Sequence, residues 1–325
     1  MKGINLGGWF VLEGWMNSHL FNDIDLTCRD ETCFTKLKEN AFEHLLNHHR
    51  TWITDQDIIW IKNQEFDLVR IPVPWWFLGE DGYARSVEIL DEKLKMINDL
   101  NMNFMIDLHT APGCQNGFDN GGIEHVLTWH LKKENLDKTK EVLVTLMKRY
   151  DHLKHFQSIE ILNEPFVTID IELIKGFYLD VYKALRNINQ KRMIVFHDAF
   201  RLNEWTTFFK NNHFYNVALD THMYQCYDKN DLALDIEGHV KKALNRSQVI
   251  NRIQMYVPLI IGEWSLGLRL SNKDALEEIA TLKAYYDAQI EGMKNAYGHI
   301  FWNYKIDSDT HVGWNFKNLK DKHGI

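Results

Sequence analysis

The chain is 325 residues long, is 45% hydrophobic and 25% charged, and carries a formal net charge of −8 at pH 7. The length and composition are ordinary for a folded protein with a sizeable core, and the acidic balance argues against nucleic acid or an anionic membrane surface as a partner. No window reaches about 18 consecutive apolar residues, so we expect no insertion into a membrane.

Short apolar runs alternate with amphipathic stretches along the whole chain. The apolar runs predict eight β-strands, at residues 3–8, 68–73, 104–109, 159–163, 193–197, 217–222, 259–263 and 300–304. The amphipathic stretches predict helices, at residues 55–64, 91–100, 136–150, 170–189, 234–253 and 273–296. This alternation is typical of an α/β fold, a closed (β/α)8 or TIM barrel. A doubly wound sheet competes, but no Gly-x-Gly-x-x-Gly pattern follows the first predicted strand. No repeat or linker appears, so we expect one catalytic domain over residues 1–325.

Two glutamates end two of the predicted strands. The fourth strand runs into Asn163, Glu164 and Pro165, and the proline, which lacks a backbone N–H, stops the strand there. The seventh strand ends on Glu263. Because the carboxyl ends of barrel strands meet on one face, we expect the two acids to meet although they are far apart in sequence. Glycosidic bond cleavage requires such a pair of acids.

Polar or aromatic side chains also occupy the ends of the other predicted strands. They are Arg70, Asp107, His109, His197, Asp198, His222, Tyr224 and Trp302. Any one of them could be an ordinary hydrogen-bonded side chain, but their gathering on one barrel face predicts an active site.

Longer motifs along nearly the whole chain resemble glycoside hydrolase family 5, in clan A of retaining glycosidases, and in particular its exo-β-1,3-glucanase branch. The motifs lie at residues 3–13 (GINLGGWFVLE), 69–73 (VRIPV), 106–120 (IDLHTAPGCQNGFDN), 162–165 (LNEP), 197–200 (HDAF), 221–225 (THMYQ), 261–264 (IGEW) and 301–302 (FW). The loop at 106–120 is the most specific of them.

The resemblance implies that Glu164 is the acid/base and Glu263 the nucleophile of a retaining double displacement. Retention requires the two carboxyl groups to lie about 5–5.5 Å apart. We expect partial burial and the nearby nucleophile to raise the pKa of Glu164. Glu263 is expected to stay ionised beside Arg70 and a hydrogen bond from Tyr224.

The resemblance also implies a set of substrate-binding residues. They are Glu13, Arg70, His109, Phe118, Asp119, Asn163, His222, Tyr224, Tyr227 and Trp302. Asn163 would hold the sugar 2-hydroxyl, Trp302 would be the stacking floor for the terminal sugar, and Phe118 and Tyr227 would form an aromatic pair at the pocket entrance. His222 would lie near the acid/base.

The expected function is removal of terminal β-linked glucose from β-1,3-glucan oligosaccharides or other β-glucosides. Endo-β-1,4-glucanase (cellulase-like) activity and aryl- or phospho-β-glucosidase activity are alternatives on the same barrel. Lys305 is the only nearby cation for a phosphate. Cys114 and the pair Asn303–Tyr304 depart from the family pattern in the outer subsites, which leaves the aglycone and the linkage open. A sugar-binding protein without activity is disfavoured because both acids are present.

We expect no metal and no cofactor, and the oligomeric state is not readable from the sequence. The chain starts at Met1 without a basic and apolar leader, which predicts a cytoplasmic protein, or a secreted one whose leader was removed. Cys28 and Cys33 lie close together in a polar loop and would pair only in an exported protein.

Overall fold

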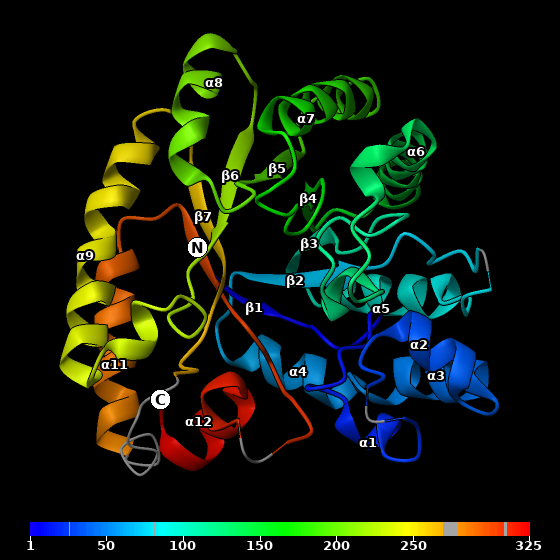
Figure 1. Ribbon diagram of the computed structural model, residues 1–325, viewed down its shortest axis with the longest axis horizontal. Coiled ribbons are helices and arrows are strands. Elements are labelled where there is room, and N and C mark those ends of the chain that lie inside the picture. The colour runs from blue at the N-terminus through cyan, green and yellow to red at the C-terminus, as the bar shows by residue number, and fades with distance from the viewer. Residues whose placement is uncertain (26, 81, 269–278, 309–310) are drawn as a thin grey trace.

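The computed structural model describes all residues except 26, 81, 269–278 and 309–310. Its centre is a closed barrel of parallel strands in the order β1 to β8, surrounded by helices (Figure 1). The strands are β1 (Lys2–Asn5), β2 (Leu68–Val73), β3 (Asn103–Leu108), β4 (Phe156–Glu160), β5 (Met193–His197), β6 (Val217–His222), β7 (Leu259–Trp264) and β8 (Gly298–Phe301). The predicted (β/α)8 barrel is confirmed.

The helices follow the predicted alternation, and helices that were not predicted occur between β1 and β2, between β5 and β6, and after β8. They are α1 (Ser18–Phe21), α2 (Glu31–Leu37), α3 (Ala41–Thr51), α4 (Asp55–Asn63), α5 (Val87–Asp99), α6 (Lys133–Tyr150), α7 (Ile171–Arg186), α8 (Thr206–Asn211), α9 (Ile236–Gln254), α11 (Ile279–Met293) and α12 (Phe316–His323). Residues 273–278 of the predicted helix at 273–296 lie outside the described residues. None of the described helices is long and apolar enough to cross a membrane.

The interior of the barrel has an apolar lower layer and a polar upper layer. The lower layer is a buried cluster of Leu68, Met105, Met193, Val195, Ala218, Ile260 and Ile300. Side chains two residues apart on a strand point to the same face, so the next interior positions belong to Arg70, Asp107, His197, Asp220, Gly262 and Trp302. The two-residue alternation of side chains along each strand therefore places polar and aromatic groups above the apolar layer. They lie at the C-terminal end of the barrel, where the active sites of this fold are found.

The fourth strand begins and ends earlier than predicted. It spans Phe156–Glu160 rather than residues 159–163, and Ile161 continues only with a single hydrogen bond from its N–H to the Val195 carbonyl. Its inward side chains, Ser158 and Glu160, are polar and buried, so the strand lacks the continuous apolar run on which the prediction depended.

A disulfide joins Cys28 and Cys33 in the segment between β1 and α3. Asp30 caps α2 by accepting a hydrogen bond from the Cys33 N–H, and it also forms an isolated antiparallel bridge with Glu13. The pairing that the sequence left open is therefore present in the structure. The Glu13–Asp30 bridge ties this loop to the residues that follow β1.

Candidate active site

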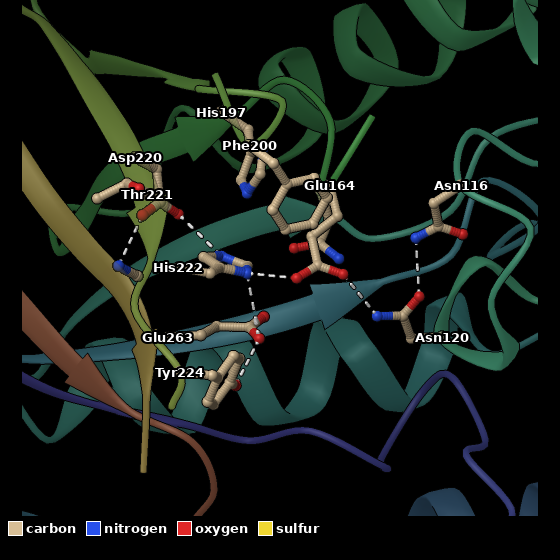
Figure 2. Close-up of polar contacts among 12 residues, drawn as sticks. Asn116, Asn120, Glu164, His197, Phe200, Asp220, Thr221, His222, Tyr224 and Glu263 are labelled. Atoms are coloured by element: carbon tan, nitrogen blue, oxygen red, sulfur yellow. Dashed lines mark hydrogen bonds and ion pairs between the residues drawn. The ribbon is translucent and has the colours of Figure 1, made fainter. Parts of the chain in front are cut away.

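Glu164 and Glu263 lie at the upper ends of β4 and β7 and contact the same nitrogen of one histidine (Figure 2). His222 Nδ1 is 2.6 Å from Glu164 Oε1 and 3.3 Å from Glu263 Oε2. The separation of these two oxygens cannot exceed the sum of the two contacts. That limit is compatible with the separation of about 5–5.5 Å at which one carboxylate can attack carbon while the other serves as acid.

Glu263 is held by two donors that come from different strands. Arg70 Nη1 donates to its Oε1 at 3.0 Å, and the Tyr224 hydroxyl donates to its Oε2 at 2.8 Å. Both contacts were implied by the family resemblance. Burial raises the pKa of Glu263, while the charges of His222 and Arg70 act in the opposite direction.

Glu164 is ionised in this arrangement, contrary to the expectation that its pKa is raised. Burial alone would raise the pKa, but the hydrogen bond from His222 and the charge of that ring outweigh burial and lower it to about 2. Asn120 Nδ2 also donates to Glu164 Oε2 at 3.0 Å. Glu164 itself has a φ of 48°, a left-handed conformation uncommon for a residue with a side chain and frequent at functional sites.

Asn120 was not predicted as a site residue. It lies in the motif at 106–120, directly after two residues that were predicted, and its amide also accepts a hydrogen bond from Asn116 Nδ2 at 2.8 Å. Its place in that motif was the only available signal.

Arg70 is the centre of a fully buried polar network. Its Nε donates to Glu160 Oε2 at 2.8 Å, its Nη1 to Asn5 Oδ1 at 2.9 Å and its Nη2 to Asn163 Oδ1 at 2.9 Å. Asp107 Oδ2 lies 3.1 Å from Nη2. Burial opposes the charge of Arg70, but the surrounding carboxylates raise its pKa well above the usual value.

This network orients the side chain of Asn163 and leaves its amide N–H group without a partner among the described residues. Because its Oδ1 accepts from Arg70, its amide nitrogen must point away, and Asn163 Nδ2 is buried without a hydrogen-bond partner among the described residues. A buried unpaired donor is costly, so this group is suited to a hydroxyl group of a bound ligand.

Trp302 is buried and lies nearly parallel to His109, with ring centroids 5.7 Å apart and an angle of 5° between the planes. His109 Nδ1 lies 2.6 Å from Asp107 Oδ2, so Asp107 orients that ring. Gly7 makes room for the indole, since a Cβ at that position would lie 2.6 Å from the ring. An aromatic face and a fixed imidazole therefore form one wall of the site.

Glu13 also belongs to the site, together with Trp15, which was not predicted and which packs against the cluster that contains Trp302. Trp15 Nε1 donates to Glu13 Oε2 at 2.9 Å, while Glu13 Oε1 is buried without a partner in the described part of the chain. Burial, and then the charge of Asp119, raises the pKa of Glu13 well above its usual value. Burial raises the pKa of Asp119 to about 6.

A cavity of about 780 Å³ opens beside these residues, and Trp15, Asp119, Tyr227 and Trp314 contribute to its lining. Tyr227 is 64% exposed and meets the ring of Tyr224 edge-on. Phe118 is 39% exposed. The two predicted entrance aromatics are therefore both accessible at this end of the barrel.

Among the residues that the structure describes, two groups of side chains come close enough together to suggest a metal site. Ligand atoms of Glu164, His197 and His222 lie within 4.8 Å of one another, as do those of Glu160, Asp220 and His222. His222 belongs to both groups: its Nδ1 lies 2.6 Å from Glu164 Oε1, its Nε2 lies 3.4 Å from Asp220 Oδ2, and the surrounding carboxylates raise its pKa well above the usual value. A protonated imidazole offers no lone pair, so the chemistry of these groups does not fit a metal and we assign none.

A protein-family model described as Cellulase (glycosyl hydrolase family 5) matches residues 33–308. A glucan 1,3-beta-glucosidase of Schwanniomyces occidentalis is 31% identical over 368 aligned residues, which cover 98% of this chain and 85% of that protein. A glucan 1,3-beta-glucosidase of Candida oleophila is also 31% identical, with 98% and 87% covered.

Solved structures share the fold. The rutinosidase from Aspergillus niger superposes with a TM-score of 0.85 at 18% identity, covering 99% of this chain and 96% of the other. The endoglucanase Cel5A from Thermotoga maritima superposes with a TM-score of 0.63 at 15% identity, covering 99% and 94%.

Proposed function

This chain belongs to glycosyl hydrolase family 5 and is a glycoside hydrolase, and we propose that it removes terminal β-linked glucose from β-1,3-glucan oligosaccharides with retention of configuration. The observation that carries the mechanism is the placement of two carboxyl groups on one imidazole nitrogen, at 2.6 and 3.3 Å. The substrate class is supported by relatives named glucan 1,3-beta-glucosidase that align over 98% of the chain.

In the first step Glu263 attacks the anomeric carbon, the glycosidic C–O bond breaks, and Glu164 gives a proton to the leaving oxygen. In the second step Glu164 takes a proton from water, and the water oxygen displaces Glu263 from carbon. Arg70 and Tyr224 each restrain one of the two oxygens of Glu263. The free donor of Asn163 would bond the 2-hydroxyl, a contact that strengthens as positive charge develops on the sugar.

Cleavage of the terminal glucose rather than of internal bonds would depend on the residues that line the pocket. We assign the sugar floor to Trp302, hydroxyl recognition to Glu13 and His109, and the entrance to Phe118 and Tyr227. The free acceptor of Glu13 and the exposed faces of the two entrance aromatics support these assignments.

The alternatives are not favoured. The curated relatives reported above are named for β-1,3-glucan rather than β-1,4-glucan. Lys305, the only cation considered for a phosphate, is 2.9 Å from Asp57 Oδ2 and lies over the ring of Trp52. Asp57 belongs to the capping box at the start of α4, so the lysine is engaged in fold stability and supports no phosphate site.

The Cys28–Cys33 disulfide also bears on location. Disulfides persist in oxidising compartments and are rare in the cytosol. We therefore favour an oxidising compartment over the cytoplasm.

One experiment tests both linkage and stereochemistry. Laminaribiose, laminaritriose, cellobiose and nitrophenyl β-glucoside are compared as substrates, and the first-formed anomer is followed by proton NMR. We expect glucose released initially as the β anomer, with the laminari-oligosaccharides preferred. Initial α-glucose would refute retention, and a preference for cellobiose over the laminari-oligosaccharides would refute the proposed specificity.

A further inference from the structure

A buried acid that the double displacement does not use directly lies behind His222. Asp220 and His222 are two residues apart on β6, so both side chains point into the barrel. Asp220 is completely buried, and its Oδ2 lies 3.4 Å from His222 Nε2, a distance of an ion pair rather than of a tight hydrogen bond. Figure 2 shows the imidazole between Asp220 on one side and the two glutamates on the other.

The backbone before the nucleophile is built around Asp220. The N–H of Gly262 donates to Asp220 Oδ1 at 2.6 Å. A Cβ at position 262 would lie 2.0 Å from Asp220 Oδ2, so no residue with a side chain fits there without displacing the carboxylate. Glycine directly before Glu263 therefore allows a carboxylate to reach His222 from below.

The charges around His222 favour its protonated form. Asp220 on β6, Glu164 after β4 and Glu263 on β7 all contact its ring nitrogens. Burial alone would lower the pKa of His222, but the charges of Glu263 and Asp220, followed by the contact with Glu164, raise it well above the usual value.

The other groups that face His222 do not remove this preference. His197 on β5 meets the ring edge-on, with centroids 4.6 Å apart, and burial lowers its pKa to about 3, so it stays neutral. Tyr224 also lies edge-on to His222, with ring centroids 6.4 Å apart. The positive charge of Arg70 is already paired with Asp107, Glu160 and Glu263. Asp198, near the end of β5, is a further acid close to the His222 ring.

We propose that Asp220 is a positioning residue that keeps a proton on His222, and that this stored proton is the one which Glu164 delivers to the leaving group. The inference rests on the proposed function. During glycosylation the His222 Nδ1–H bond breaks, an O–H bond forms on Glu164, and that proton passes to the glycosidic oxygen. At the same time Glu263 becomes a neutral ester, so one of the three negative charges that hold the proton on His222 disappears.

The second step reverses this transfer. Glu164 takes a proton from the attacking water and returns it to His222 as the sugar leaves Glu263 and the carboxylate charge reappears. The proton count of the site is then restored. This route explains how a carboxyl group that is ionised in the free enzyme can act as the general acid.

The variant Asp220→Asn tests the positioning role through leaving-group dependence. We expect kcat for laminaribiose, whose leaving group needs protonation, to fall about 10²-fold or more. The rate for dinitrophenyl β-glucoside, which needs no protonation, should fall far less, and the basic limb of the pH profile should move down by about one unit. The matched control is Asp231→Asn, a buried acid that pairs with Lys242 rather than with His222; it should leave the ratio of the two rates unchanged. An equal fall for both substrates with an unmoved basic limb would overturn the inference.

Nitrogen-15 NMR of histidine-labelled wild-type enzyme provides a test that needs no variant. His222 should remain an imidazolium in the free enzyme at pH values where an ordinary histidine is neutral, and it should become neutral once Glu263 is esterified by a 2-deoxy-2-fluoro-glucoside. A neutral His222 in the free enzyme, or an unchanged signal in the esterified enzyme, would overturn the inference alone. If the fluoro sugar fails to label Glu263, the proposed function itself is wrong.

Discussion

The guanidinium of Arg70 lies 3.0 Å from Glu263 Oε1 in a part of the barrel that excludes water completely from the arginine. The same side chain pairs with Glu160 and Asp107. Arg70 therefore compensates several buried carboxylates at once, and both the stability of the barrel and the orientation of Glu263 depend on it.

Replacing this arginine should destabilise the fold strongly. Arg70→Met leaves Glu160 and Asp107 without their cation, and breaking buried ion pairs from one side costs about 3–5 kcal/mol. Urea unfolding measures the loss. The matched control is Arg186→Met, because the hydrogen bonds of Arg186 go to backbone carbonyls. This variant should lose less free energy of unfolding than Arg70→Met. Equal losses would contradict the argument that Arg70 acts by compensating buried charges.

The variant Glu263→Gln should abolish turnover while preserving the fold. An amide is a poor nucleophile, yet it keeps the size of the carboxylate and one acceptor for Arg70 or Tyr224. We expect kcat to fall roughly 10³-fold or more, with unfolding midpoints close to wild type. Near-normal turnover in a correctly folded variant would refute the nucleophile assignment.

The variant Glu164→Ala should lose most activity on substrates whose leaving group needs protonation. Azide should restore part of that activity. General acid catalysis contributes about 10²–10⁴-fold to the rate. The hydrolysis rate of nitrophenyl β-glucoside should therefore fall less than that of laminaribiose. The cavity left by the side chain admits a small anion, which attacks the glycosyl–Glu263 ester without base assistance. The product to detect is β-glucosyl azide. Failure of azide to raise the rate, or formation of the α-azide, would contradict the acid/base role.

Buried histidines should make the protein less stable as the pH falls below about 6.5. Burial lowers the pKa of His48 to about 4, although its Nε2 bonds the Gly8 carbonyl at 2.7 Å. Below the unfolded pKa the unfolded chain binds a proton that the folded chain does not, so stability is lost from pH 6.5 down to about 4.

The variant His48→Gln keeps a donor for Gly8 and removes the titration. Between pH 6.5 and 4.5 its free energy of unfolding should vary less steeply than that of the wild type, by up to about 1.4 kcal/mol per pH unit. The exposed His213→Gln is the control and should leave the slope unchanged. An identical slope in His48→Gln would show that this residue titrates alike in both states.

Removing the disulfide should affect substrate binding more than chemistry. The double variant Cys28→Ser, Cys33→Ser opens a short loop whose Arg29 carbonyl accepts from the N–H of Gly14, next to Glu13. Loop entropy predicts a loss of about 2 kcal/mol in stability. With Glu13 less well positioned, KM should rise while kcat changes little. A fall in kcat at unchanged KM would contradict this reading.

Much of this molecule could be predicted from periodicity and motifs alone. Alternating apolar and amphipathic stretches determine a barrel because each strand must bury both faces and each helix one. Position at a strand end then brings Glu164 and Glu263 to one face, whatever lies between them in sequence. Local sequence suffices for these features because they depend on neighbours two to four residues away.

Only the tertiary structure decided where the proton resides. The pKa of Glu164 is lowered rather than raised because a histidine from β6 reaches it across the barrel, and Asp220 supports that histidine from below. Asn120 and Trp15 became site residues for the same reason, through contacts with Glu164 and Glu13. Electrostatic interactions depend on distances through space between side chains of different strands, and no spacing along the chain specifies those distances.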